Sequence, residues 1–196
     1  MTDPAGNQRK LVSDGLGRLK YVVEAGTYTT TCGYNALDNL TGVNQSGQTR
    51  TFFYSSLGRL TGASNPESGT VSYTYDNSGN LLTRTDARNL LTTTAYDNLK
   101  RTKTKSYSDG TTPNVTYCYD GTTWTGTYAQ CTGSRVALFV GHLTEEGSSA
   151  SSTAFTNYDS LGRVTASVQT TAGTPYPSFS FAPFCLPLPL TGAAAS

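Results

Sequence analysis

The chain is poor in charge, in histidine and in methionine. Only 14% of its 196 residues are charged, the formal net charge is +1, and it contains one histidine and one methionine. A nearly neutral chain lacks the basic surface that marks nucleic-acid or anionic-membrane partners. We therefore expect no nucleic-acid partner.

Long apolar runs are also missing. The longest apolar stretch, FAPFCLPLPL at residues 181–190, is interrupted by three prolines and is well below the roughly 20 residues that a membrane-spanning helix needs. The first ten residues, MTDPAGNQRK, lack the apolar core of a signal peptide. We expect no membrane insertion, and no signal peptide is visible in this chain.

Threonine, serine, glycine, asparagine and tyrosine dominate what remains, with 20 glycines and 13 tyrosines. Threonine and tyrosine favour pleated, half-buried surfaces, while glycine, asparagine and aspartate supply turns. The composition predicts an all-β protein.

A seven-residue pattern, Tyr-Asp-x-x-Gly-Arg/Asn-Leu, recurs about every 21 residues. The regular period predicts about eight units, the first of them partial. Clear copies lie at 54–60, 75–81 and 158–164; weaker copies lie at 13–19, 34–40, 96–102 and 137–143, and a degenerate copy begins at Tyr119.

A second turn signal precedes several copies by 11 residues, as in SNPESG at 64–69. Between the turns, apolar and polar residues alternate: Val71, Tyr73 and Tyr75 would share one face of a strand. Aspartate and asparagine open tight turns through their side chains, and glycine accepts a positive φ. The sequence therefore predicts antiparallel β-hairpin repeats.

We assign structural roles to the motif residues. The tyrosine is expected on the covered face with its hydroxyl on a polar group or water, the seventh-position leucine or valine as its apolar partner, and the arginine either stacked on a tyrosine or paired with an acid. The predicted structural residues are Tyr54, Gly58, Arg59, Leu60, Tyr75, Asp76, Gly79, Asn80, Leu81, Tyr96, Asp97, Tyr158, Asp159, Gly162 and Arg163.

These motifs resemble the YD-repeat family, also called RHS repeats, of large bacterial secreted and cell-surface proteins, which is related to the repeats of teneurins. The resemblance covers roughly residues 1–175. It implies a hairpin ribbon that spirals into a β-shell, here a partial one. It also implies a secreted or cell-surface location, and as partners the rest of the parent polypeptide or an enclosed C-terminal toxin effector. The self-cleaving segment that closes complete members has no counterpart motif here, so the resemblance implies architecture and no catalysis.

We expect the chain to be a fragment of a longer RHS protein. The pattern begins inside a repeat and loses its register after Tyr176. A truncated or frame-shifted gene would produce such an ending, and the sequence does not tell whether the gene is either. The expected organisation is a repeat array over residues 1–176, followed by an irregular, disordered tail over residues 177–196.

Candidate chemical sites are weak by comparison. The repeated aspartates fit turn formation better than paired catalytic acids or calcium ligands, and His142 has no second histidine beside it. We predict no catalytic residue, cofactor or metal. Cys118 and Cys131 would face each other across a hairpin that turns near Trp124–Gly126, so a cross-strand disulfide and two free thiols both remain open.

The favoured function is that of a non-enzymatic structural segment. The rival is a surface module that binds carbohydrate or protein through exposed tyrosines, Trp124 and asparagines. An enzyme with a catalytic groove would need clustered acids, which the regular spacing of the aspartates does not provide.

Overall fold

The structure is a computed structural model that describes residues 4, 6, 8–24, 28–171 and 173–177. The chain forms two compact units, and each is described by itself. The first consists of residues 1–94 with 107–110, and the second of residues 95–106 with 111–196. The predicted irregular tail, apart from Pro177, lies outside the described residues, so the boundary at 176 remains a prediction.

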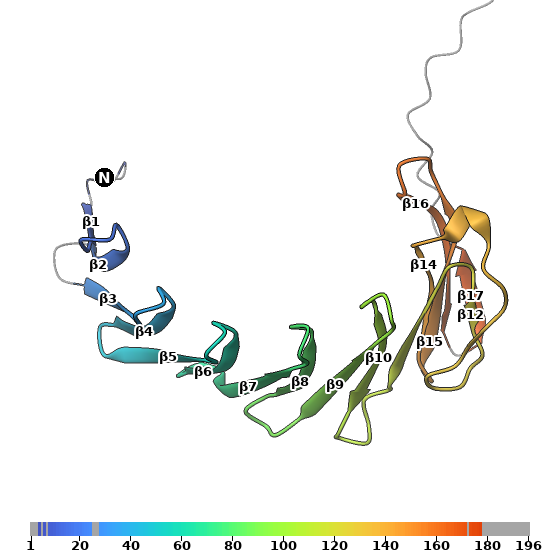
Figure 1. The fold of residues 1–196 in the computed structure, drawn as a ribbon, viewed down its shortest axis with the longest axis horizontal. Helices are drawn as coiled ribbons and strands as arrows, with labels where there is room; N and C mark the ends of the chain where they lie inside the picture. The colour runs from blue at the N-terminus through green and yellow to red at the C-terminus, as the bar shows by residue number, and fades with distance from the viewer. Residues whose placement is uncertain (1–3, 5, 7, 25–27, 172, 178–196) are drawn as a thin grey trace, which may run out of the picture. The chain divides into compact units, whose positions relative to one another are not determined.

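The first unit is made of eight strands (Figure 1): β1 (Arg9–Ser13), β2 (Leu19–Glu24), β3 (Tyr28–Tyr34), β4 (Leu40–Gln45), β5 (Gln48–Tyr54), β6 (Leu60–Asn65), β7 (Gly69–Tyr75) and β8 (Leu81–Thr85). Strands β9 (Leu91–Tyr96) and β10 (Thr102–Tyr107) have residues in both units.

The second unit continues with β11 (Val115–Tyr119), β12 (Thr123–Trp124), β13 (Cys131–Thr132), the 3-10 turn η1 (Ala137–Phe139), β14 (Leu143–Gly147), β15 (Ser151–Tyr158), β16 (Val164–Thr171) and β17 (Thr174–Pro177). Within the described ranges, no helix is long and apolar enough to cross a membrane.

Fifteen of the strands join into one sheet whose order follows the chain, while β12 and β13 form a small sheet of their own. The strands of the described residues pair in antiparallel fashion, as in the hairpin β7–β8, where Tyr75 is paired with Leu81. The predicted fold class, an all-β ribbon of antiparallel hairpins of the kind that builds a β-shell, is confirmed.

The Tyr-Asp turns share one set of backbone hydrogen bonds. In the turn of β7–β8, the N–H of Asp76 donates to the carbonyl of Asn80 at 2.9 Å, and the N–H of Gly79 donates back to the carbonyl of Asp76 at 3.1 Å. This geometry requires a left-handed residue three positions after the aspartate. Gly79 takes it with φ 92°, and Lys100 takes it in the corresponding turn with φ 62°.

The backbone ladders that join successive hairpins lie toward one end of the strands. Between β6 and β7 the ladder runs from Gly62–Ser72 to Asn65–Gly69, at the end far from the Tyr-Asp turns. It stops short of Leu60 and Tyr75. The backbones of neighbouring hairpins are thus unpaired at the edge where the Tyr-Asp turns lie, and side chains must join them there.

Few apolar side chains are buried. Among the described residues the buried apolar set is Val22, Ala63, Val71 and Cys118. Strand β7 shows the predicted alternation, since Val71 is buried while Thr70, Ser72 and Thr74 are exposed. With so small an apolar core, the fold depends strongly on its hydrogen bonds and side-chain stacking.

Two predicted repeat copies are halves of one repeat. Tyr119 pairs with Leu143 as Tyr75 pairs with Leu81, and both pairs follow a β-bulge. The N–H of Asp120 donates to the carbonyl of His142 at 3.1 Å, as Asp76 does to Asn80. The separate copy predicted at 137–143 is therefore wrong: residues 121–141, which we call the insert, lie inside a single Tyr-Asp turn.

Candidate functional site

The repeat tyrosines bridge neighbouring hairpins. Within the first unit, the hydroxyl of Tyr34 donates to the carbonyl of Leu19 at 3.0 Å, and that of Tyr75 to the carbonyl of Leu60 at 2.8 Å. We call Tyr34, Tyr54, Tyr75, Tyr119 and Tyr158 the rung tyrosines; the other three donate to the carbonyls of Leu40, Thr102 and Leu143. Each bond reaches the carbonyl at the seventh position of the preceding motif, where no backbone ladder joins the two hairpins.

An arginine or histidine side chain lies over the ring of several rung tyrosines. The guanidinium carbons of Arg18 and Arg59 lie 4.8 Å and 5.9 Å from the ring centroids of Tyr34 and Tyr75. In the second unit, Arg101 lies 4.2 Å from the ring of Tyr119. Each arginine comes from the sixth position of the preceding motif, so the same slot supplies the stacking partner of the next rung.

His142 fills that slot after the insert. Its ring is stacked on Tyr158, with centroids 4.3 Å apart and an interplanar angle of 24°. A Cβ added at Gly162 would lie 2.8 Å from the imidazole, so this ring also fits against the next turn. The sole histidine is thus a stacking residue at an arginine position.

The motif aspartates are bound inside their own turns. One carboxylate oxygen of Asp159 accepts the N–H groups of Leu161 and Arg163, each at 2.9 Å, and the other accepts Nε of Arg163 at 2.7 Å. Hydrogen bonds to the ionised carboxylate hold the pKa of Asp159 below its ordinary value, with the backbone N–H of Arg163 the largest contributor. The pKa values of Asp14, Asp76 and Asp86 are lowered too, chiefly by side-chain hydrogen bonds from Arg18, Asn80 and Arg88.

The remaining predicted motif residues take equivalent places. Tyr54 and Tyr96 end strands β5 and β9, Leu60 and Leu81 begin β6 and β8, and Asp97 accepts Nε of Arg101 at 2.7 Å. Gly58 and Gly162 have φ values of 72° and 75°, as the turn requires. The structure shows both arrangements considered for the arginines, because Arg101 stacks on a tyrosine and pairs with acids.

The insert is tied to the sheet by a disulfide between Cys118 and Cys131, whose Cα atoms are 5.7 Å apart. The two cysteines do not face each other across one hairpin, as the sequence suggested. Cys118 is paired with Glu145 in the large sheet, and Cys131 with Trp124 in the small one. The disulfide therefore connects two sheets. Cys32 is half-buried and free.

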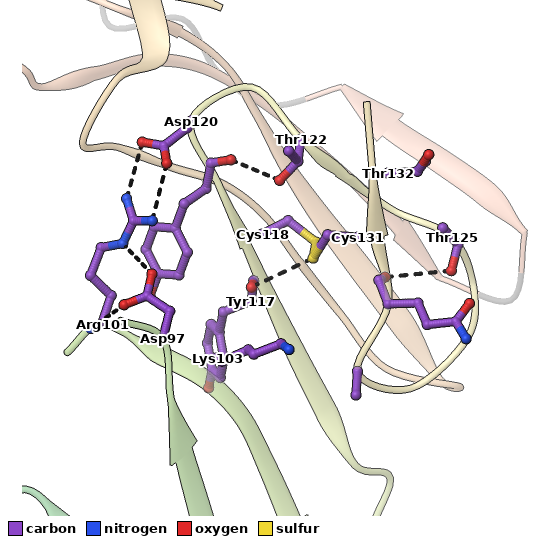
Figure 2. A pocket seen from close by; sticks show the side chains of 13 residues that line it. Asp97, Arg101, Lys103, Tyr117, Cys118, Asp120, Thr122, Thr125, Cys131 and Thr132 are labelled. Atoms are coloured by element: carbon purple, nitrogen blue, oxygen red, sulfur yellow. Dashed lines mark hydrogen bonds and ion pairs between the residues drawn. A yellow bond between two sulfur atoms is a disulfide. The ribbon is translucent and has the colours of Figure 1, made fainter. Parts of the chain in front are cut away.

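Asp120 connects the insert to Arg101, as Figure 2 shows, and also bonds to two residues of the insert. Its carboxylate accepts Nη1 and Nη2 of Arg101 at 3.0 Å and 3.1 Å, the N–H of Gly141 at 2.7 Å, and Nη2 of Arg135 at 3.3 Å. These bonds, those from Arg101 first, hold its pKa far below the ordinary value, and the bond to Asp120 in turn raises the pKa of Arg101. Asp120 is buried, so the bidentate pair gains from reduced solvent screening.

Trp124 packs the insert against β14. Its backbone N–H donates to Oε2 of Glu145 at 2.8 Å, and its indole N–H donates to the carbonyl of Thr127 at 2.9 Å. A Cβ added at Gly147 would lie 2.3 Å from two atoms of the Trp124 ring system. The indole therefore lies directly over this glycine.

An open hollow of about 590 Å³ separates the insert from the start of β10 and the end of β11. Figure 2 shows Arg101 between Asp97 and Asp120 on one side and the disulfide on the other. The two acidic residues that line the hollow, Asp97 and Asp120, both form ion pairs with Arg101. In the described part of the chain, no group of three histidine, cysteine or acidic side chains is arranged to hold a metal ion.

Sequence reasoning missed the insert and its Arg101–Asp120 anchor. The signal was present in the spacing, because the motif starts at 119 and 137 departed from the period of 21 in opposite directions. Gly141-His142-Leu143 was the missing second half of the motif that starts with Tyr119-Asp120.

Replacing Tyr75 by phenylalanine should lower the free energy of unfolding by about 0.5–1.5 kcal/mol, because the carbonyl of Leu60 loses its donor while the ring is kept. Urea unfolding measures the change. Tyr28→Phe is the matched control: Tyr28 is 63% exposed, and its loss should stay within about 0.5 kcal/mol. Equal losses in both variants would contradict the bridging role.

Acid should destabilise the protein through the turn carboxylates. Their folded-state pKa values are lowered, so their stabilisation is complete above the unfolded-chain value of about 3.9 and is lost as the pH falls through the folded-state values. Urea unfolding between about pH 6 and about pH 2 should show this decline. Asp159→Asn keeps the turn acceptor, as Asn35 does in its own turn, and should make the decline shallower; an unchanged profile would be contrary to this account.

Gly147→Ala should displace Trp124 and loosen the insert, because the new methyl group overlaps the indole. We expect a loss of about 1–3 kcal/mol and red-shifted fluorescence from this single tryptophan. Gly42→Ala is the control, since its Cβ would meet the carbonyl oxygen of Arg50 at an ordinary 3.7 Å. Unchanged emission in Gly147→Ala would exclude the packing described.

Comparisons with known proteins bear on the repeats and on the fold. The family model of the RHS repeat matches residues 34–70 and 54–90. A search of curated protein sequences found no match.

Solved structures match over most of the chain. A crystal structure of TcdB2-TccC3-Cdc42 has a TM-score of 0.64 at 12% identity and covers 90% of this chain. A Photorhabdus luminescens Tc holotoxin pore carrying a TccC3 mutation has a TM-score of 0.58 at 16% identity and covers 86%. In both, this chain spans 9% of the matched chain. At these identities the likeness concerns the fold. Together with the family match, it confirms the resemblance seen in the Tyr-Asp motifs: this chain carries RHS repeats, matched directly over residues 34–90.

Proposed function

We propose that the chain is a non-enzymatic wall segment of an RHS β-shell, whose parent protein encloses or displays a C-terminal toxin effector. The observation that carries this proposal is the contact made by each rung tyrosine. The characteristic side chains of each repeat join that repeat to the preceding one. Tyr75, for example, bonds to Leu60 and lies beneath Arg59. A segment built this way extends a sheet and offers no reaction centre of its own.

The partners follow from the size of the matched chains. This chain spans 9% of the length of the matched chains; one of those structures is TcdB2-TccC3-Cdc42, which has several components by name, and another is named a Tc holotoxin pore. The first partner of a wall segment is then the remainder of its own polypeptide, and the second is the enclosed effector. A protein of this kind acts outside the cell that makes it, so we place the parent protein at the cell surface or in the secreted fraction.

The state of the acids argues against an enzyme. Asp159 is held by two backbone N–H groups and Arg163, and Asp120 by Arg101, Arg135 and Gly141. Carboxylates that accept this many hydrogen bonds have lowered pKa values and are poor general acids or bases near neutral pH.

A carbohydrate-binding module is less well supported. Sugar recognition would need aromatic faces open to the ligand, whereas Arg18, Arg59 and Arg101 lie over the rings of the following tyrosines. Tyr158 is covered by His142 in the same way. The rings of these four rung tyrosines are therefore occupied within the chain.

The test is to express the complete reading frame that contains this chain, together with any downstream segment, and to follow proteolysis of that segment. Protection in native buffer that is lost in mild denaturant is the expected result. A downstream segment that is cleaved as fast within the whole protein as in isolation would refute encapsulation. Binding on a glycan array that disappears in Tyr28→Ala would instead favour the surface module.

A further inference from the structure

The turns of the ribbon carry a row of exposed leucines that neither the motif nor the wall role uses. Leu16, Leu37 and Leu57 lie two positions after Asp14, Asn35 and Ser55, the residues that open three successive turns of the first unit, and they are 73%, 65% and 73% exposed. We call them the tip leucines. Leu99 and Leu161 occupy the same position in the second unit and are 64% and 76% exposed.

The turn itself does not require leucine. Only the backbone N–H of this position is used: Leu16 donates to Asp14, and Leu37 to Asn35, each at 2.9 Å. Ser78 fills the same place in the turn of β7–β8 and supplies the same kind of bond to Asp76. Tight turns otherwise favour small or polar residues. An apolar side chain at most tips therefore conflicts with local preference, which is expected at positions selected for contact.

The interrupted repeat retains this feature. Val140 precedes Gly141 as Leu161 precedes Gly162, and Val140 is 53% exposed although 18 extra residues separate it from Tyr119. An apolar tip is thus restored where the regular spacing is lost.

The charged groups beside the first two tips, Leu16 and Leu37, are paired. Arg18 binds Asp14 at 2.7 Å and Asp38 at 2.6 Å, which neutralises the acids between Leu16 and Leu37. At the other edge of the first unit, the turns at Ser46–Gly47 and at 66–68 are polar, and Glu67 pairs with Arg50. Among the described turns of the first unit, exposed leucines with paired acids beside them lie at the Tyr-Asp edge, so a partner for this edge should be apolar rather than charged.

Neighbouring tips are separated by two strands, which places them about 10 Å apart. A partner with apolar side chains at the same interval is a second stretch of the same ribbon. We propose that the tip leucines form a docking edge for the Tyr-Asp edge of another stretch of RHS ribbon, represented in solution by a second copy of this chain. This goes beyond the wall role, in which each hairpin contacts only its neighbours in the sheet.

The contact should be weak between separate chains. Three leucines from each copy cover far less than the roughly 800 Å² per partner of a standard stable interface. Within one polypeptide the same contact would gain from a high effective concentration, so that successive rounds of a ribbon could be held together by their tips.

The test is sedimentation equilibrium of the chain from low micromolar to millimolar concentration. The wild-type chain should self-associate weakly, and the triple variant Leu16→Ser, Leu37→Ser, Leu57→Ser should raise the dissociation constant by at least about tenfold. The control is Leu11→Ser with Leu91→Ser, which removes exposed leucines on strands β1 and β9 and should leave the association unchanged.

A wild-type chain that stays monomeric at millimolar concentration would overturn the proposal, as would equal weakening in both variants. Tip-dependent binding to lipid vesicles without self-association would also overturn it. Urea unfolding should show the triple variant folded with an unchanged free energy. The wall role is tested separately by protection of the downstream segment, so either idea can fail without the other.

Discussion

The hydrogen bond from a rung tyrosine to a carbonyl of the preceding hairpin is the contact on which the rest of the ribbon depends. At the Tyr-Asp edge the backbones of successive hairpins are unpaired, so each tyrosine supplies the missing donor and its ring fills the space. The arginine of the preceding motif then stacks on that ring, as Arg59 does on Tyr75. One side chain thus satisfies a polar group and provides packing in a sheet with very little apolar core.

The turns make this arrangement repeatable. Each aspartate fixes its loop by accepting backbone N–H groups and orients the arginine that stacks on the next rung, as Asp97 does for Arg101. The insert shows how much the turn tolerates. Although residues 121–141 replace the three residues of an ordinary turn, Asp120 still bonds to His142 and Gly141, and Tyr119 still bonds to Thr102. The disulfide and Trp124 then secure the added chain without altering the ladder around it.

Much of the fold was predictable because its determinants are local. The period of 21, the alternation in 69–75 and the turn residues predicted antiparallel hairpins, and the structure has them. The acceptor of each tyrosine was not predictable, since it depends on how far neighbouring hairpins separate. Nor was the insert recognised, because Tyr119 and Leu143 are neighbours only through long-range pairing. The tip leucines were visible in the sequence, but the proposal that they form a docking edge also needed their exposed fractions, which only the structure provides.

Native-state hydrogen exchange on the first unit tests the central role of the rungs most directly. In the wild-type chain, amides of β3 to β8 should exchange through one common opening, because the rungs couple neighbouring hairpins. With Tyr34, Tyr54 and Tyr75 all replaced by phenylalanine, the hairpins β3–β4, β5–β6 and β7–β8 should open separately and with different free energies. A single common opening that persists in the triple variant would contradict the account, because the coupling would then come from the backbone ladders alone.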